Sequence, residues 1–363
     1  MRVPLVDLAR LHAPLREELD RAWARVVDSG RFVMGDEVDA FERELAELAG
    51  VPFAVAVSSG TDALLTSLMA LGIGPGDEVV TSAFSFIAAA ETIARLGATP
   101  VFADIGDDFN LDPESVRSRI SARTRAIVPV DLFGRRANVE GLGEHGIALV
   151  EDAAQAIGAR GVGHGVRAAA LSFFPTKNLG ALGDGGALLT DDSVLADAMR
   201  LLRAHGSGPK YVHACMGGNM RLDALQAAIL RVKLPRVAQW NATRRGIARR
   251  YREELADVSG VALPADEGGH VWHQFVVRAR PGRDGAPNAR RDALRAHLGE
   301  RDVETEVYYP LALHLQPCFA HLPKVHLPNA VTATSEAVAL PVHPALGDDE
   351  VGHVIAALRS FKG

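Results

Sequence analysis

Apolar residues recur at helical spacing in two segments near the start of the chain, residues 14–28 and 36–49. Charged residues fill the opposite face of each segment and Gly30 follows the first, so we predict two amphipathic helices. Between residues 53 and 190 the pattern changes, because short apolar runs of strand length alternate with helical segments. This alternation predicts an α/β fold in which a mostly parallel sheet carries helices on both faces.

The strands of this sheet are predicted from segments that each contain an apolar run. Residues 53–74 are predicted to form a strand, a turn and a helix, and residues 76–105 a strand, a loop, a helix and a strand. Residues 124–134 and 145–154 each add a strand, and residues 168–190 add two strands around a turn that contains a lysine. In sheets of this class ligands bind beyond the carboxyl ends of the strands, so polar residues at those ends are candidates for a site.

The pattern changes again near Pro235. We therefore expect a large domain over residues 1–235 and a smaller α+β domain over residues 236–363. One helix before this boundary is predicted to be opened by Asn219 and Arg221. This helix covers residues 221–234, and the other predicted helices cover 193–204, 289–299, 332–340 and 348–361, with a basic helix around 244–251. Residues 270–281 and 303–310 are predicted to form strands.

Composition places the chain among ordinary globular proteins. Its 363 residues suffice for two domains, 48% of them are hydrophobic, and the mean hydropathy is +0.07. No apolar run approaches the ~20 residues that a membrane span needs, and Arg2, Asp7 and Arg10 leave no room for the apolar core of a signal peptide. We therefore expect a cytoplasmic protein that makes no membrane contact.

Charge and cysteine content argue against other classes of protein. The net charge is −6 and the charged residues of both signs are interspersed, so no basic face is expected to bind nucleic acid. Cys215 and Cys318 are too few for a disulfide framework, lack CxxC spacing, and are expected to be reduced thiols. The 13 histidines show no HExxH or similar spacing, so no metal site is expected.

Lys177 carries the strongest chemical signal in the chain. It follows an apolar run and is flanked by the hydroxyls of Ser172 and Thr176, and a lysine is costly to hold in such a setting unless its amine has a task. Asp152 ends another apolar run, which predicts a carboxylate at the carboxyl end of a strand. A lysine that forms a Schiff base and an aspartate that pairs with a pyridinium nitrogen are the two groups a pyridoxal phosphate enzyme needs. This pair makes pyridoxal phosphate chemistry our working hypothesis.

Two other segments carry weaker signals, and each has a simpler alternative. Ser59 and Thr61 lie at a junction of strand, turn and helix, where backbone amides can bind an anion, but both residue types are also common N-caps. Phe84 and Phe86 follow a predicted strand, where an aromatic ring could stack on a planar cofactor, although core packing explains either residue equally well. Neither segment identifies a site by itself.

The order of these features along the chain is more specific than any one of them. The motifs in that order are SSGTDAL (58–64), FSFIAAAE (84–91), EDAAQAIGA (151–159), SFFPTKNLG (172–180), GDGGALLT (183–190), NMRLDALQAAIL (219–230) and YYPLALHLQP (308–317). Together they resemble the motifs of the DegT/DnrJ/EryC1/StrS family of nucleotide-sugar aminotransferases, from the first helix to the last. The resemblance implies fold type I of the pyridoxal phosphate enzymes, in a homodimer that builds each active site from both subunits.

The resemblance assigns a role to each matching residue around the cofactor ring. Lys177 is implied to form the Schiff base and to move the proton during amino transfer. Asp152 is implied to keep the ring nitrogen protonated, and Gln155 to lie near the phenolic oxygen of the ring. Phe86 rather than Phe84 matches the aromatic residue that stacks on the ring. Because relatives that have lost this lysine act as dehydratases, its presence here favours transamination.

The resemblance also implies a binding site for the cofactor phosphate. Gly60 and Thr61 are implied to hold it through backbone amides, with a hydrogen bond from Ser172. Asn219 matches a residue that reaches the phosphate from the neighbouring subunit. Simpler roles are open for three of the residues: Asp152 as a strand-end cap, Ser172 as a strand hydroxyl and Asn219 as a helix N-cap.

Tyr308, Tyr309 and His314 match the region in which the family's small domain approaches the sugar. Tyr308 stands where many members have histidine, and a packing role for one of the two tyrosines is an alternative. The implied reaction transfers an amino group from L-glutamate to a keto group of a nucleotide-diphosphate sugar, with a 3-keto sugar favoured over a 4-keto sugar. The alternatives are a pyridoxal phosphate-dependent sugar dehydratase or lyase, and a regulatory cofactor-binding protein without catalysis.

Overall fold

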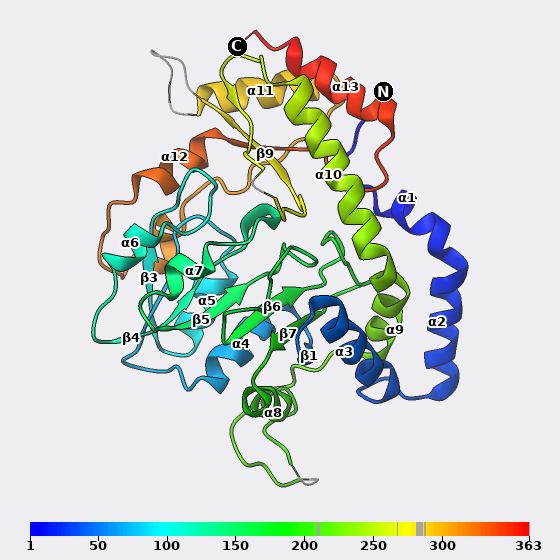
Figure 1. Cartoon of the computed structure of the whole chain (residues 1–363), viewed down its shortest axis with the longest axis vertical. Coiled ribbons are helices and arrows are strands. Elements are labelled where there is room, and N and C mark those ends of the chain that lie inside the picture. Colours follow the sequence, from blue (N-terminus) through cyan, green and yellow to red (C-terminus); the bar gives the residue numbers. More distant parts are fainter. Residues whose placement is uncertain (209–210, 267, 281–285, 287, 363) are drawn as a thin grey trace.

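The centre of the protein is a seven-stranded sheet in the order β1-β7-β6-β5-β4-β2-β3 (Figure 1). The computed structural model describes residues 1–208, 211–266, 268–280, 286 and 288–362. All neighbouring strands are parallel except β7, which is antiparallel to both β1 and β6. The strands are Phe53–Val57 (β1), Glu78–Ser82 (β2), Thr99–Ala103 (β3), Thr124–Val128 (β4), Ala148–Asp152 (β5), Ala168–Ser172 (β6) and Gly186–Thr190 (β7).

Successive residues of these strands are buried on opposite faces of the sheet. In β1, Ala54 and Ala56 belong to the hydrophobic cluster on one face, and Val55 and Val57 belong to the cluster on the other. This is the alternation of a strand whose two faces are both covered, and it explains why the strands are apolar throughout.

Helices from distant parts of the sequence cover the two faces. One face is covered by α2 (Arg16–Ser29), α3 (Asp36–Ala49), α6 (Pro113–Arg117), α7 (Val139–Gly143) and α9 (Ala224–Lys233). The other face is covered by α4 (Gly60–Ala70), α5 (Ala88–Arg95) and α8 (Ser193–Leu202). The N-terminal α1 (Leu8–His12) precedes α2 through the short 3-10 helix Ala13–Leu15.

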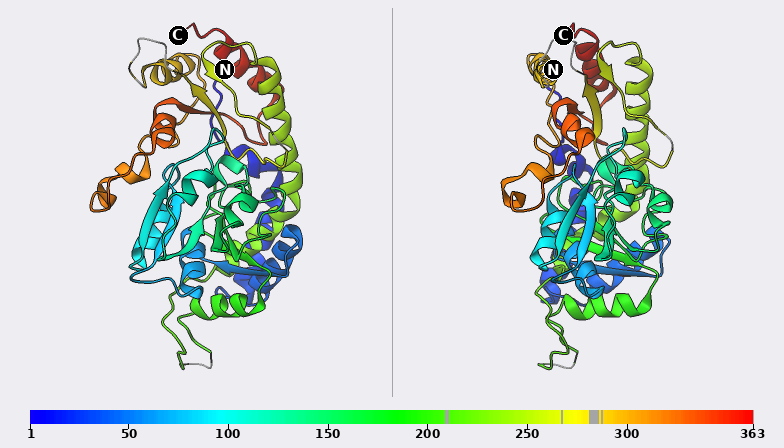
Figure 2. Two further views of the ribbon diagram at one scale, coloured as in Figure 1. Left: turned by 60° about the vertical axis from the view of Figure 1, so that its left-hand side comes forward. Right: turned by 90° about the vertical axis from the view of Figure 1, so that its left-hand side faces the viewer.

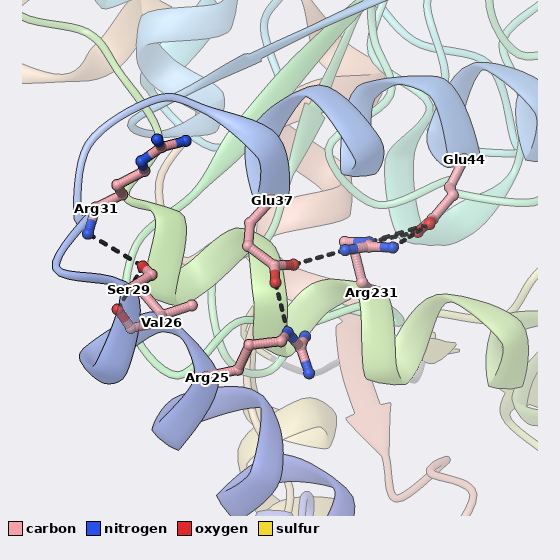
Figure 3. Close-up of polar contacts among 7 residues, drawn as sticks. All are labelled: Arg25, Val26, Ser29, Arg31, Glu37, Glu44 and Arg231. Atoms are coloured by element: carbon pink, nitrogen blue, oxygen red, sulfur yellow. Dashed lines mark hydrogen bonds and ion pairs between the residues drawn. The ribbon is translucent and has the colours of Figure 1, made fainter.

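An ion-pair network fastens the N-terminal helices to α9 (Figure 3). Arg231 of α9 binds Glu37 at 2.6 Å and Glu44 at 2.7 Å, both on α3. Glu37 also binds Arg25 of α2 at 2.7 Å, so one carboxylate joins three helices. Burial and two arginine partners act on Glu37 in opposite senses, and its pKa is lowered. The network fixes α9 beside α3.

A second sheet, with three antiparallel strands in the order β10-β9-β8, lies at the other end of the molecule. The helix α10 runs along the side of the protein from α9 toward this sheet (Figures 1 and 2). Val3, near the N-terminus, pairs with Val303 and is buried in the hydrophobic cluster of this region. The elements are α10 (Val237–Glu254), β8 (Val261–Ala262), β9 (Phe275–Ala279), α11 (Ala289–Gly299), α12 (Pro328–Glu336), β10 (Ala337–Leu340) and α13 (Asp348–Arg359).

The segment between α11 and β10 reaches back to the edge of the large sheet (orange in Figure 2). The amide of Leu313 donates to the carbonyl of Ala83 at 2.7 Å, just beyond β2. The ring of Phe319 packs against that of Phe102 on β3, with 5.3 Å between centroids. The two parts of the molecule therefore share contacts beside the carboxyl ends of β2 and β3. No helix of the described residues is long and apolar enough to cross a membrane.

The structure confirms the predicted α/β class and the mostly parallel sheet, and it changes four predicted boundaries. The helix expected to open at Asn219 begins at Ala224 with Asp223 as its N-cap, because the Ala224 amide bonds to the carbonyl of Phe32 and holds the preceding residues extended. Asn219 is therefore not the N-cap, and it pairs instead with Ala204.

The other three changes lie in the C-terminal part. Residues 303–310 form no regular strand, because only Val303 and Glu306 make single bridges to other segments. The helix predicted over 332–340 ends at Glu336, and the four residues that follow pair with β9 as β10. The strand predicted over 270–281 is regular only as β9, and its last residue, Pro281, lies outside the described residues.

Candidate active site

Lys177 lies in a compact loop between β6 and β7, which are antiparallel neighbours in the sheet. The amide of Ala181 donates to the carbonyl of Phe173 at 2.8 Å and closes the loop. Gly180 approaches Pro175 so closely that a Cβ on it would lie 2.2 Å from the Pro175 carbonyl oxygen. The loop therefore folds back on itself and holds Lys177 just beyond the carboxyl end of β6.

The alternation of the strands places three groups on one side of the sheet. Val150 of β5 and Ala170 of β6 belong to the cluster on the α4 side. Asp152 and Ser172 each lie two residues further along their strands, so they point to that side as well. Both residues are the last of parallel neighbouring strands, so the side chains meet at the same edge of the sheet as the Lys177 loop.

The Glu151 side chain points to the opposite face of the sheet and binds other residues of the protein. It is fully buried, accepts a hydrogen bond from Arg136 at 2.6 Å and another from the amide of Gly163 at 2.8 Å. These contacts satisfy its charge on the α3 side of the sheet. Of the two carboxylates that end β5, Asp152 is therefore the one available to a ligand.

Asp152 and Lys177 perturb each other electrostatically. Asp152 is 5% exposed, and burial raises its pKa to about 6, although the Ala154 amide at 3.1 Å and the charge of Lys177 both favour the carboxylate. Burial lowers the pKa of the partly buried Lys177 to about 8, opposed by the charge of Asp152. Between these two pKa values both groups are charged, and the lowered pKa of Lys177 makes its neutral, nucleophilic form easier to reach than that of a free lysine.

Gly60 and Thr61 form the first turn of α4, directly above Ser172. The Ser59 hydroxyl accepts the Asp62 amide at 3.0 Å, whereas the amides of Gly60 and Thr61 belong to the helix N-terminus and have no intrahelical acceptor. A Cβ on Gly60 would lie 2.7 Å from the Ser172 Cβ, so glycine is required where the two elements meet. Free amides, a helix N-terminus and a serine hydroxyl together suit a phosphate group.

The two phenylalanines after β2 occupy different environments. Phe84 is 1% exposed and stacks on Phe109 with 5.7 Å between centroids, so it is a core residue. Phe86 is 56% exposed, although its centroid lies 6.4 Å from that of Tyr309. An exposed aromatic ring beside the carboxyl ends of the strands is available to stack on a planar ligand. Of the two rings, only that of Phe86 is therefore accessible to a ligand.

Gln155 presents a fixed hydrogen-bond donor to the same region. Its Oε1 accepts the amide of Phe133 at 2.6 Å, which fixes the orientation of the amide group. Its Nε2 therefore faces the other way and donates to the Tyr309 hydroxyl at 3.4 Å. Burial raises the pKa of Tyr309, so this phenol stays protonated. An amide donor at this position suits the anionic phenolic oxygen of a pyridoxal ring.

Pyridoxal phosphate fits the residues that the structure gathers here. The first turn of α4 meets Ser172 at Gly60, where a Cβ cannot be accommodated and backbone amides lie close to a hydroxyl, and Phe86 offers an unpacked ring face. A buried carboxylate and a partly buried amine supply the two groups that the cofactor's nitrogen and aldehyde require.

The three residues expected near the substrate are distributed over two places. Tyr309 lies within the candidate cofactor site, against Gln155 and Phe86. Tyr308 packs on Tyr309 with 5.8 Å between centroids and hydrogen-bonds with Gln274. His314 lies at the edge of the large sheet, with its ring 6.5 Å from that of Phe102, and no described contact joins it to the other site residues.

Asn219 is exposed and lines a surface hollow of about 480 Å³ together with Ser58, Asp184 and Gln226. Ser58 precedes the first turn of α4 by two residues, so this hollow borders the candidate phosphate site from outside.

Three polar residues around the Lys177 loop could not be found from the sequence. The Asn178 Nδ2 donates to the Oδ1 of Asn241 at 2.8 Å, and its Oδ1 binds the Nδ1 of His273 at 3.1 Å. Burial and the charge of Lys177 hold the pKa of His273 well below its usual value, so this imidazole is neutral. Asn241 and His273 lie 63 and 95 positions from Asn178, and no local pattern marks them.

Over nearly its whole length the chain is similar to proteins that are named as regulators and to a protein that is named as a sugar transaminase. It is 43% identical to a pleiotropic regulatory protein of Geobacillus stearothermophilus, with 99% of each chain covered. It is 45% identical to the erythromycin biosynthesis sensory transduction protein EryC1 of Saccharopolyspora erythraea, over 99% of this chain and 100% of that one. It is 43% identical to a dTDP-3-amino-3,4,6-trideoxy-alpha-D-glucose transaminase of Streptomyces venezuelae, over 99% and 96%.

Solved structures of related proteins share this fold. Streptomyces venezuelae DesV, crystallised with a ketimine intermediate, superposes with a TM-score of 0.94 at 43% identity, over 99% of this chain and 98% of that one. The Bacillus subtilis protein NtdA with bound cofactor PMP gives a TM-score of 0.93 at 30% identity, over 98% and 84%. Residues 14–359 match the family model described as the DegT/DnrJ/EryC1/StrS aminotransferase family. The chain therefore belongs to the DegT/DnrJ/EryC1/StrS aminotransferase family, whose members depend on pyridoxal phosphate.

Proposed function

We propose that the protein transfers an amino group from L-glutamate to the keto group of a nucleotide-diphosphate sugar, with a 3-keto sugar preferred over a 4-keto sugar. The observation that carries the proposal is that Lys177 and Asp152 lie within electrostatic reach of each other at the carboxyl ends of β5 and β6. The transaminase relative named for a 3-amino sugar supports the choice of the 3-keto group.

Lys177 and Asp152 carry the chemistry in this proposal. Bound pyridoxal phosphate supplies an aldehyde that accepts the amino group and a ring that withdraws electrons. Lys177 holds the cofactor through its Nζ, and once released it moves a proton at the carbon that gains or loses the amino group. The Asp152 carboxylate, ionised above pH 6, keeps a proton on the ring nitrogen.

The remaining site residues orient the cofactor. We assign the phosphate to the amides of Gly60 and Thr61 and the hydroxyl of Ser172, and the ring face to Phe86. The Gln155 amide donates to the phenolic oxygen, because its other end is occupied by Phe133. Tyr308, Tyr309 and His314 would meet the sugar, and the contact between Tyr309 and Gln155 supports this role best for Tyr309.

We further propose that two copies of the chain form a dimer and that Asn219 completes the phosphate site of the partner copy. Asn219 lies on the rim of an open hollow, and Val33 in the same hollow is 49% exposed. Leu182 and Met216, in neighbouring segments of the chain, are exposed as well, and such apolar residues favour burial against a second copy. The test mixes inactive Lys177→Ala and Asn219→Ala chains. Partial recovery of activity on mixing supports a shared site, and no recovery together with a dimer in solution contradicts it.

The decisive assay incubates the purified protein with L-glutamate and a panel of UDP- and dTDP-linked 3-keto and 4-keto sugars. We expect one 2-oxoglutarate per amino sugar formed, because the amino group passes through the cofactor. A dehydratase or lyase would consume the sugar without forming 2-oxoglutarate. Absence of 2-oxoglutarate with any amino donor would contradict the proposed function.

A regulatory role is a second candidate, because two relatives carry regulatory names. The buried Asp152 does not separate the two roles, because a regulator that binds the same cofactor would use this carboxylate as well. Replacement of Lys177 by Ala separates the two roles. A variant without turnover but with full biological activity would favour regulation.

A further inference from the structure

A second lysine holds the loop that carries Lys177. The Nζ of Lys233, in the last turn of α9, donates to the carbonyl of Gly180 at 2.7 Å. Gly180 lies three residues after Lys177, at the point where the loop folds back on Pro175. Lys233 is 1% exposed, so this hydrogen bond is shielded from water. A charge-assisted bond in such a setting fixes the position of the carbonyl more firmly than a neutral donor would.

Lys233 is an unusual residue to bury. Among the described residues its amine has no carboxylate as a partner, and burial alone lowers its pKa to about 8. An uncompensated buried charge costs stability, so its presence calls for a specific task. The chain contains 39 lysines and arginines, and only Lys177, Lys210, Lys233, Lys324 and Lys362 are lysines. Arginine is thus the common basic residue here, and Lys233 places a compact ammonium against the Gly180 carbonyl.

His12 supplies the second acceptor for this amine. Its Nε2 lies 2.9 Å from the Lys233 Nζ, and since the ammonium can only donate, the imidazole accepts through Nε2 and is neutral. Burial and the charge of Lys233 lower the pKa of His12 to about 4, in agreement with that assignment. His12 ends α1, and Arg10 on the same helix binds Glu350 of α13 at 2.7 Å. The N-terminal segment thus links the C-terminal part of the molecule to the Lys177 loop.

Within the loop, the Ala181 amide bonds to the Phe173 carbonyl, and other contacts tie the loop to neighbouring helices at points on either side of Gly180. The Leu182 amide donates to the Oε1 of Gln226 on α9 at 2.8 Å, and Asn178 binds Asn241 on α10. Gln226 and Lys233 both belong to α9, whose position is fixed by Arg231 and its partners (Figure 3). The loop is therefore anchored to α9 through Leu182, which follows Lys177 by five residues, and to α10 through Asn178, which directly follows Lys177.

We propose that Lys233, with His12 as its acceptor, is a positioning residue that sets where the Lys177 amine stands relative to the cofactor. The proposal rests on the proposed role of Lys177. Lys233 touches neither cofactor nor substrate in this proposal, and it acts through the Gly180 carbonyl. Its removal should therefore impair every step in which Lys177 takes part and leave intact the binding of a cofactor form that does not use Lys177.

The test compares two cofactor forms in the Lys233→Met variant of the full chain. Methionine matches the length of the lysine stem and removes its donors. After the cofactor is stripped, we expect the rate of covalent attachment of pyridoxal phosphate, followed by absorbance, to fall by about 10- to 100-fold, because a small misplacement of a reacting group has effects of that size. The Kd for pyridoxamine phosphate, which forms no bond to lysine, should change by less than about twofold. Lys324→Met, at an exposed lysine, should leave both values unchanged.

Two results of this comparison would contradict the proposal. A wild-type attachment rate in Lys233→Met, or an equal loss in attachment and in pyridoxamine phosphate binding, overturns the positioning role. Should Lys233→Met fail to fold, His12→Leu removes the acceptor alone, and attachment should fall by a few-fold with pyridoxamine phosphate binding unchanged.

Borohydride reduction followed by peptide mapping identifies the lysine that carries the cofactor. If that lysine is not Lys177, the proposed function of Lys177 fails, whereas attachment at Lys177 with no effect of Lys233→Met refutes only this inference.

Discussion

Replacement of Asp152 by Asn should make the cofactor-free protein more stable while it abolishes most of the activity. Asparagine keeps the shape of the side chain and can still accept the Ala154 amide, but it carries no charge. The charge is what the proposed reaction needs at the ring nitrogen, and it is also what burial penalises. The variant therefore separates the effect of the carboxylate charge on activity from its effect on the free energy of unfolding.

The magnitude follows from the pKa of Asp152. This pKa is about 6 in the folded protein, against about 3.9 in an unfolded chain. Because the folded value is the higher one, ionisation costs stability, and the cost appears as the pH rises from about 4 and is complete above about 6. At 1.36 kcal/mol per pKa unit, Asp152→Asn should raise the free energy of unfolding by about 1 kcal/mol at pH 4.5 and by about 3 kcal/mol at pH 7.5.

Urea unfolding of the stripped protein, followed by tryptophan fluorescence at the two pH values, measures this difference. Asp28→Asn, at an exposed aspartate, makes the same change of charge and should show no comparable gain. A variant that is less stable than the wild type at pH 7.5, or a gain that is the same at both pH values, would refute the reasoning. Full transaminase activity of Asp152→Asn would show that the ring nitrogen lies elsewhere.

Further predictions concern the phosphate, the ring and the amine. Gly60→Ala puts a methyl group 2.7 Å from the Ser172 Cβ and should raise the Kd for pyridoxal phosphate by about 10-fold or more, whereas Gly74→Ala, with nothing within 4 Å of the added Cβ, should not. Phe86→Leu should weaken cofactor binding in the same titration by about 1 kcal/mol, the size of an aromatic contact, and an unchanged Kd would show that the ring stacks elsewhere. The rate of cofactor attachment should rise with pH and level off near pH 8, the pKa of Lys177, whereas a rise that continues to about pH 10 would contradict a lowered pKa.

The residues of the candidate site that the sequence singled out are those whose position follows from local pattern. Asp152 and Ser172 end predicted strands, and the order of strands and helices puts such ends at one edge of a parallel sheet. Two-residue alternation then decides the side to which they point, as the contrast between Asp152 and Glu151 shows. The position of polar residues at strand ends can thus be predicted from the sequence, because it depends only on the two-residue period of the strands and on the order of strands and helices along the chain.

Boundaries that depend on long-range pairing cannot be predicted from local sequence. Residues 337–340 have a composition that suits helix as well as strand, and only their pairing with β9 makes them β10. The start of α9 moved to Ala224 because the chain before it is tied to Phe32, almost two hundred positions away. In both places tertiary hydrogen bonds override local propensity.

The sequence by itself determined the α/β class, the cofactor and the lysine that is proposed to hold it, because strand period, motif order and side-chain chemistry are local properties of the chain. Only the tertiary structure decided what holds that lysine in place. His12 and Lys233 lie 221 positions apart, and Lys233 and Gly180 lie 53 apart. No periodicity relates such residues, since packing of separate helices against the sheet alone brings them together.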